Sequence, residues 1–180
     1  VIPLSIEGKK PLISWKKYQT ENTTQEELDE WFEQGVKTES GNTVSLFNMA
    51  LVTGSISGVI VLDCDNEKAV QFALKNDMTS PFVVSTARGK HFYFAHPMNG
   101  QRFANKVGNT ARDWYPVEGL DLRGDGGYVV MPPSMKVKEG KAEHIYHMEV
   151  GYGLSLDDIA DFPWKGEPSD TDPLIEGEFT

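Results

Sequence analysis

Two aspartates separated by one residue end an apolar, β-branched run, Gly58-Val-Ile-Val-Leu-Asp-Cys-Asp65. Residues two apart in a strand project from the same face, so we predict that Asp63 and Asp65 point together and Cys64 points away. Converging carboxylates repel each other unless a cation lies between them, and hard oxygen ligands suit Mg²⁺ or Mn²⁺. Because these ions usually share their coordination with substrate phosphates, the pattern predicts a metal-dependent site for a phosphate-bearing substrate.

A second group of reactive residues lies in Ser85-Thr-Ala-Arg-Gly-Lys-His91. Gly89 lets the backbone approach a ligand closely, while Arg88, Lys90 and His91 supply positive charge and hydrogen-bond donors. We therefore predict that this turn grips a triphosphate.

A third group follows further along the chain, in Leu120-Asp-Leu-Arg123 and the Ser134 that comes after Pro132-Pro133. Asp121 has the same apolar strand context as Asp63, and Arg123, two residues on, is predicted on the same face. Taken singly, each of these residues is also compatible with a structural role in packing, in a turn or in a cap. Their order and contexts together favour one shared site.

The elements that must position these residues are read from hydrophobic periodicity and turn residues. Thr23-Thr-Gln-Glu26 predicts a capping box, with the Thr23 hydroxyl capping a helix that ends near Gly35. Asn66 predicts the N-cap of a second helix through about Lys75. Strands are expected at Ile2–Ile6, Phe47–Thr53, Val59–Asp63, Pro81–Thr86, His91–Ala95, Val117–Arg123, Gly127–Met131 and His144–Val150, and a short helix at Ser155–Phe162.

Hairpins are expected around Ala87–Lys90 and around Gly124-Asp-Gly126, so the mixture of helices and hairpins predicts an α+β fold. At 180 residues, the chain fits one domain, and we expect a catalytic domain over 1–164 followed by a flexible, acidic linker over 165–180.

Composition restricts the function classes. The net charge of −10 argues against a broad basic surface of the usual nucleic-acid-binding kind, although a local basic groove is compatible with it. Cys64 is the only cysteine, so neither an internal disulfide nor a cysteine-rich zinc site is expected, and a cytoplasmic location is the default. No stretch approaches the roughly 20 apolar residues of a spanning helix, so we expect no membrane partner.

Several motifs follow one another in a specific order: Lys10-Pro11, Trp15, Thr53-Gly54, the 58–65 run, Lys90-His91-Phe-Tyr-Phe94, Leu120-Asp-Leu-Arg-Gly-Asp-Gly-Gly-Tyr-Val-Val130 and Pro132-Pro-Ser134. In this order the chain resembles, over residues 3–150, the bifunctional primase–polymerase (prim–pol) domain of the archaeo-eukaryotic primase superfamily, found in plasmids, phages and other mobile elements. The resemblance implies a small αβ subdomain packed on an RNA-recognition-motif-like subdomain, with the active site in the cleft between them.

The resemblance also implies roles for individual residues. Asp63, Asp65 and Asp121 match the family's metal-binding acids and would hold Mg²⁺ or Mn²⁺ in a two-metal site. His91 matches the histidine that contacts the triphosphate of the incoming nucleotide. Where the family often has Ser or a Gly-Gly pair before this histidine, the chain has Gly89 and Lys90.

The resulting expectation is template-directed nucleotidyl transfer, as DNA primase or DNA polymerase, in replication of a mobile element or phage. Arg88, Lys90, His91, Arg123 and Ser134 are the candidate nucleotide-binding residues. The expected partners are a single-stranded DNA template, a primer, NTP or dNTP, and a helicase domain or protein beyond the C-terminus. Two alternatives remain at this point: a metal-dependent glycosyltransferase using a nucleotide sugar, and a non-catalytic nucleotide- or nucleic-acid-binding module.

Overall fold

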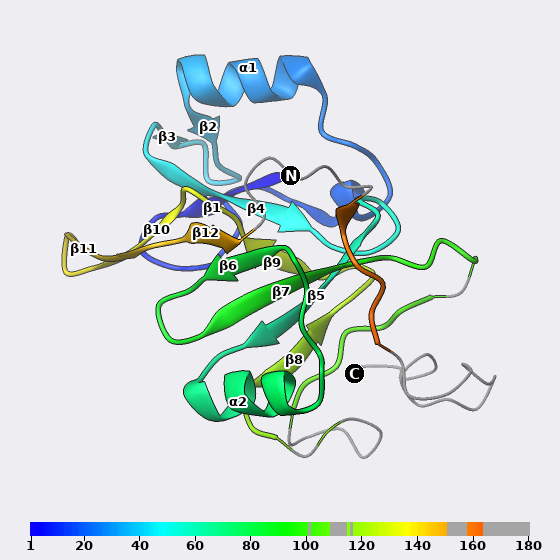
Figure 1. The fold of residues 1–180 in the computed structure, drawn as a ribbon. Coiled ribbons are helices and arrows are strands. Elements are labelled where there is room, and N and C mark those ends of the chain that lie inside the picture. Colours follow the sequence, from blue (N-terminus) through cyan, green and yellow to red (C-terminus); the bar gives the residue numbers. More distant parts are fainter. Residues whose placement is uncertain (101, 109–114, 116, 151–157, 164–180) are drawn as a thin grey trace.

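The computed structural model describes residues 1–100, 102–108, 115, 117–150 and 158–163. In this part the chain combines two α-helices with several antiparallel sheets, a mixed architecture compatible with the predicted α+β class. In Figure 1, α1 and α2 lie at opposite ends of the molecule with the sheets between them. The elements are β1 (Ile2–Ser5), the 3-10 turn η1 (Lys16–Gln19), α1 (Gln25–Gln34), β2 (Val36–Lys37), β3 (Thr43–Val44), β4 (Phe47–Val52), β5 (Val59–Cys64), α2 (Glu67–Lys75), β6 (Val83–Ser85), β7 (Lys90–Ala95), β8 (Leu120–Arg123), β9 (Tyr128–Val130), β10 (Met135–Lys138), β11 (Lys141–Ile145) and β12 (His147–Val150).

The main sheet has five strands in the order β12-β6-β7-β5-β8. Each neighbouring pair is antiparallel, so β5 is an interior strand with β7 on one side and β8 on the other. All six residues of β5 are buried, which explains why its sequence is a continuous apolar run rather than an alternating one.

A smaller sheet, in the order β1-β4-β9, packs against one face of the main sheet. Two separate cores result. The first lies between α2 and the main sheet and includes Leu62, Cys64 and Phe92. The second lies between the two sheets, where Val61 and Tyr93 meet residues of β1, β4 and β9. The main sheet is therefore covered on both faces, and each face of β5 is dedicated to one core.

Several expectations are confirmed locally. The side chain of Asn66 accepts a hydrogen bond from the Ala69 N–H and caps α2, which ends at Lys75. Strands β6 and β7 pair as the predicted hairpin. Gly35 follows α1 with a φ of 86°, a left-handed conformation that favours glycine.

The predicted capping box is displaced by one residue. Thr24 and Glu27 form it, and the Thr23 hydroxyl instead bonds to the amino group and carbonyl of Val1. The sequence has two threonines followed by two glutamates, so both frames satisfy the capping pattern. The contact of Thr23 with the start of β1 selects the frame.

The expected hairpin around Gly124-Asp-Gly126 is wrong. Strand β8 pairs with β5 in the main sheet, whereas β9 pairs with β4 in the smaller one. The turn therefore carries the chain from one sheet to the other. Glycine-rich turn chemistry is the same in both cases, and the partner strands, which are distant in sequence, decide between them.

Two further differences concern the C-terminal part. The strand expected at His144–Val150 is divided at Tyr146, a buried residue, so β11 forms a hairpin with β10 and β12 joins β6. Of the helix expected at Ser155–Phe162, residues 155–157 lie outside the described part, and Asp161 makes a parallel bridge to Ala95. Within the described residues, no helix is long and apolar enough to cross a membrane.

Candidate active site

The register of the main sheet places three chemically active side chains in one row. Asp63 on β5 is directly opposite His91 on β7 and directly opposite Asp121 on β8. Cross-strand partners project from the same face, so the three side chains share the face that looks toward the smaller sheet. All three residues are buried, with 3%, 1% and 8% of their surface exposed, respectively.

Arg123 connects the two acids. Its Nη2 lies 2.8 Å from Asp121 Oδ2 and 3.4 Å from Asp63 Oδ2, so both carboxylates converge on a single cationic group. Arg123 follows Asp121 by two residues on β8 and consequently projects from the same face. Two buried carboxylates in register would repel each other, and the guanidinium offsets this repulsion.

His91 lies against the other side of Asp63. Its Nε2 is 3.3 Å from Asp63 Oδ1, but the two groups are not aligned for a hydrogen bond. Asp63 Oδ1 and both ring nitrogens of His91 thus remain buried without a hydrogen-bond partner among the described residues. Unsatisfied buried polar atoms are costly, and their concentration here is typical of a site that a ligand completes.

The electrostatics of the two acids differ. Burial alone would raise the pKa of the Asp63 carboxyl, but the adjacent His91 and the positive charges of Arg123 and Lys9 hold it well below its usual range. For Asp121, burial raises the pKa, and the Gly108 N–H and Arg123 offset this only in part. The surroundings therefore favour the ionised form of Asp63 and disfavour that of Asp121, which a further cation would stabilise.

A cavity of about 310 Å³ lies between the two sheets beside these residues. Its wall on the main sheet carries Asp63, His91 and Arg123. Its other wall is formed by Lys9, Trp15, Asn105 and residues 126–130, and Trp15 packs edge-on against Tyr128 with ring centroids 5.0 Å apart. We take this cavity as the candidate active site because it is lined by Asp63, His91 and Arg123, and Arg123 also contacts Asp121.

Lys9, Asn105 and Tyr128 were not among the site residues expected from the sequence. Lys9 lies in Gly8-Lys-Lys-Pro11, whose residue types favour a turn, but nothing local in the sequence links this turn to Asp63. Asn105 lies in an irregular segment with no periodicity to interpret.

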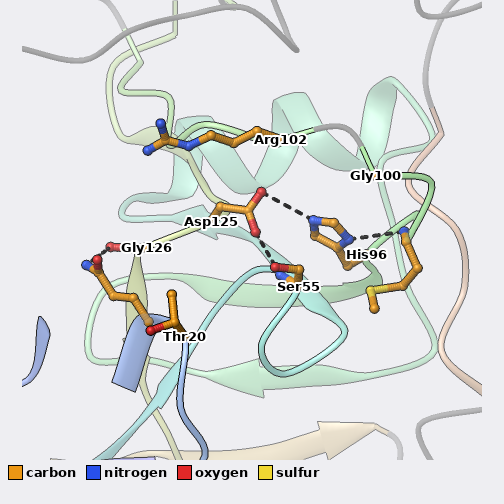
Figure 2. A pocket seen from close by; sticks show the side chains of 9 residues that line it. Thr20, Ser55, His96, Gly100, Arg102, Asp125 and Gly126 are labelled. Atoms are coloured by element: carbon orange, nitrogen blue, oxygen red, sulfur yellow. Dashed lines mark hydrogen bonds and ion pairs between the residues drawn. The ribbon is translucent and has the colours of Figure 1, made fainter. Parts of the chain in front are cut away.

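A larger cavity of about 480 Å³ adjoins the first at Gly126 and is shown in Figure 2. Asp125 and His96, which line it, are bonded to neighbouring groups and to each other. Asp125 accepts hydrogen bonds from the N–H groups of Ser55 and Phe103 and faces His96 Nε2 at 3.4 Å, and His96 Nδ1 accepts from the Met98 N–H. Burial alone would raise the pKa of Asp125, but these donors lower it.

The hydrogen bonds of Asp125 therefore hold the turn between β8 and β9 in place. Asn105 also holds this turn, since its side chain accepts a hydrogen bond from the Gly124 N–H and donates one to the Asp125 carbonyl. Because residues 126–130 continue from this turn into the wall of the smaller cavity, these hydrogen bonds fix that wall relative to Asp121 and Arg123.

The remaining predicted residues are placed less centrally. Asp65 follows β5 and pairs with the exposed Arg88, whose Nη2 is 3.5 Å from Oδ1. Lys90 is the register partner of Cys64, on the face that packs against α2, and its ammonium pairs with Glu149. Ser134 exchanges hydrogen bonds with the backbone of Met49, as a structural hydroxyl. Burial raises the pKa of the Cys64 thiol to about 12, which disfavours thiolate chemistry there.

The donor set fits a divalent cation. No three His, Cys, Asp or Glu side chains within the described ranges lie close enough together to hold a metal in the present arrangement. However, Asp63 and Asp121 already converge on one positive group, no described residue bonds to Asp63 Oδ1, and Asp65 directly follows β5, which carries Asp63. Carboxylate oxygens of this kind are ligands for Mg²⁺ and Mn²⁺.

Comparison with known proteins gives a family. The model of a family described as "Bifunctional DNA primase/polymerase, N-terminal" (Prim-Pol) matches residues 1–164, which include every element described above. No curated protein sequence matches the chain.

Proposed function

The chain belongs to the Prim-Pol family of bifunctional DNA primases/polymerases, and from this premise we propose that it catalyses template-directed nucleotidyl transfer, as a DNA primase, a DNA polymerase or both. In this reaction a 3′-hydroxyl attacks the α-phosphate of an NTP or dNTP. A new phosphorus–oxygen bond forms, and the bond to the β-phosphate breaks to release pyrophosphate. The observation that carries the proposal is the row of His91, Asp63 and Asp121 in the main sheet, with both acids converging on one cationic group.

We further propose that the main sheet with α2 is the RNA-recognition-motif-like subdomain and that the smaller sheet with α1 belongs to the αβ subdomain. The supporting observation is that the candidate cavity has one wall on each sheet. Residues 1–164 would then form the catalytic domain. The linker proposed for residues 165–180 lies outside the described part.

Asp63, Asp65 and Asp121 would hold Mg²⁺ or Mn²⁺ in a two-metal arrangement, and no zinc is required. When bound, these ions neutralise the charge that develops on the reacting phosphate and on its attacking and leaving oxygens. The low pKa of Asp63 supports this role, because an acid that is fully ionised at neutral pH binds a cation without first losing a proton.

The other side chains of the site would act on the nucleotide. His91, whose two ring nitrogens have no hydrogen-bond partner in the described part of the chain, is suited to donate a hydrogen bond to a phosphate oxygen. Arg123 would exchange its present carboxylate partners for phosphate when cations bind the acids. Arg88, exposed and paired with Asp65, would be a further phosphate contact. Lys90 and Ser134 receive less support, because both are engaged elsewhere.

A single-stranded DNA template and a primer are the partners that this reaction requires. Replication of a mobile element or phage, together with a helicase domain or protein acting beyond the C-terminus, is the setting we propose for it. The supporting observation for DNA as substrate is the family match.

Incorporation of labelled dNTP on a primed single-stranded template, with Mn²⁺ or Mg²⁺, tests the proposal. Asp63→Asn should lower kcat by about a thousandfold or more, since loss of charge stabilisation by bound cations costs several kcal/mol of the barrier. The matched control Asp29→Asn, on the exposed surface of α1, should retain activity. Turnover of a nucleotide sugar, or metal-dependent dNTP binding without any incorporation, would refute the polymerase assignment.

A further inference from the structure

The turn between β1 and η1 brings a lysine to the candidate active site from the N-terminal end of the chain. Lys9 lines the same cavity as Asp63, His91 and Arg123. Its charge acts on Asp63, since Lys9 is one of the groups that lower the pKa of that acid. Residue 9 therefore belongs to the electrostatic environment of the site although it is 54 positions away from Asp63 in the sequence.

The backbone of this turn is fixed on both sides. The Tyr128 hydroxyl donates a hydrogen bond of 2.9 Å to the Lys9 carbonyl, and Tyr128 in turn packs against Trp15. The Ser5 N–H donates to the Lys10 carbonyl at 2.8 Å. The position of the Lys9 Cα is thus determined by residues of the cavity wall, while its side chain is exposed and extends from a fixed point.

The ammonium group of Lys9 is uncommitted. It forms no ion pair or hydrogen bond with any of the residues that the structure describes, whereas Arg123 in the same cavity already contacts two carboxylates. In a chain with a net charge of −10, a lysine that lines an acid-containing cavity and pairs with no acid of the described part is suited to an anionic ligand. A compact ammonium on a flexible four-carbon stem is suited to bind phosphate oxygens as a point charge.

We propose that Lys9 binds the phosphates of the incoming nucleotide that leave as pyrophosphate. Lys9 is exposed where it lines the cavity, whereas Asp63, which would hold a cation at the reacting phosphate, is buried in the cavity wall. The exposed side chain therefore meets the outer part of the triphosphate. Tyr128 is a positioning residue for this contact because its hydroxyl holds the Lys9 backbone.

The inference rests on the proposed function and is tested by calorimetric binding of three probes in the presence of Mn²⁺ and without turnover: dATP, pyrophosphate and a single-stranded DNA oligonucleotide. Lys9→Gln should weaken dATP and pyrophosphate about ten- to a hundredfold, the loss expected for one charge-assisted hydrogen bond, and should leave oligonucleotide affinity within about twofold. Lys9→Arg should restore part of the loss. Tyr128→Phe should weaken pyrophosphate by less than Lys9→Gln does.

Lys10→Gln is the matched control. It removes the same charge from the neighbouring residue, whose side chain lines a different surface hollow with Pro11 and Leu12, and it should leave all three affinities unchanged. The inference is overturned if Lys9→Gln binds dATP like the wild type, or if it loses only oligonucleotide binding. Failure of the wild-type protein to bind dATP with Mn²⁺ would instead refute the proposed function and the inference with it. Because Lys9 is exposed and pairs with none of the described residues, Lys9→Gln should unfold near the wild-type temperature.

Discussion

Arg123→Gln offers the sharpest physical test of the candidate site, because the guanidinium is the only group that contacts both acids in the described part of the chain. Breaking a buried ion pair by removing one partner costs about 3–5 kcal/mol. The Arg123 side chain is 29% exposed, so water replaces part of its contribution, and we expect a loss of about 2 kcal/mol in metal-free protein. With a urea m-value of about 2 kcal/mol per M, the unfolding midpoint should fall by about 1 M.

The same variant should respond to metal in the opposite direction. Asp63 and Asp121 lose their competing internal cation, so Mn²⁺ should bind more tightly than in the wild type and restore most of the lost stability. Urea unfolding in EDTA and in Mn²⁺ measures both effects. Arg88→Gln is the control; that side chain is 71% exposed, and its removal should shift the midpoint little in either buffer. An Arg123→Gln midpoint that is unchanged in EDTA, or equally reduced with and without Mn²⁺, would refute the reasoning.

Three further predictions follow from the same geometry. Asp121→Asn should abolish metal-dependent stabilisation. In metal-free protein it should raise the free energy of unfolding near neutral pH by about 1 kcal/mol, because burial raises the pKa of Asp121 and disfavours its ionised form. Calorimetry at pH 7 and under acidic conditions measures this gain, which should vanish in acid. Glu27→Gln should cost about 1 kcal/mol at pH 7: burial alone would raise the pKa of Glu27, but its hydrogen bonds lower it from 4.5 to about 2, so the stability difference should disappear as pH falls through that range, and parallel curves across it would contradict the assignment. Gly89→Ala should lose about 2 kcal/mol or more in urea unfolding, because a Cβ there would lie 1.8 Å from the Cys64 carbonyl oxygen, while Gly8→Ala, with open space around it, should be nearly neutral.

The sequence predicts those parts of the site that depend on one strand or helix. The apolar run before Asp63 and the Asn66 cap are local signals, and both lead to the elements observed. Strand alternation also shows that residues adjacent in sequence project from opposite faces of a sheet. Since His91 shares a face with Asp63, the neighbouring Lys90 must project from the other face, as its register with Cys64 shows.

The parts that could not be predicted depend on pairing between distant segments. Gly124-Asp-Gly126 has the composition of a hairpin turn, and only the partners of β8 and β9 in two different sheets reveal that it connects them. Lys9 reaches the site through the Tyr128 hydroxyl, a contact across 119 positions for which no spacing rule exists. Such contacts depend on the free energy of the whole fold relative to that of alternative arrangements of the chain, and not on any local pattern.

The interior location of β5 has a consequence for how the site can move. Asp63 is held by strands on both sides, so displacing its backbone would require the opening of the main sheet, and its amide hydrogen should exchange only through global unfolding. The exposed Lys9 side chain, in contrast, changes rotamer within nanoseconds. A ligand entering this cavity would thus meet a rigid carboxylate, Asp63, and a mobile ammonium group, Lys9. Selectivity among ligands of similar charge would therefore depend on the mobile group.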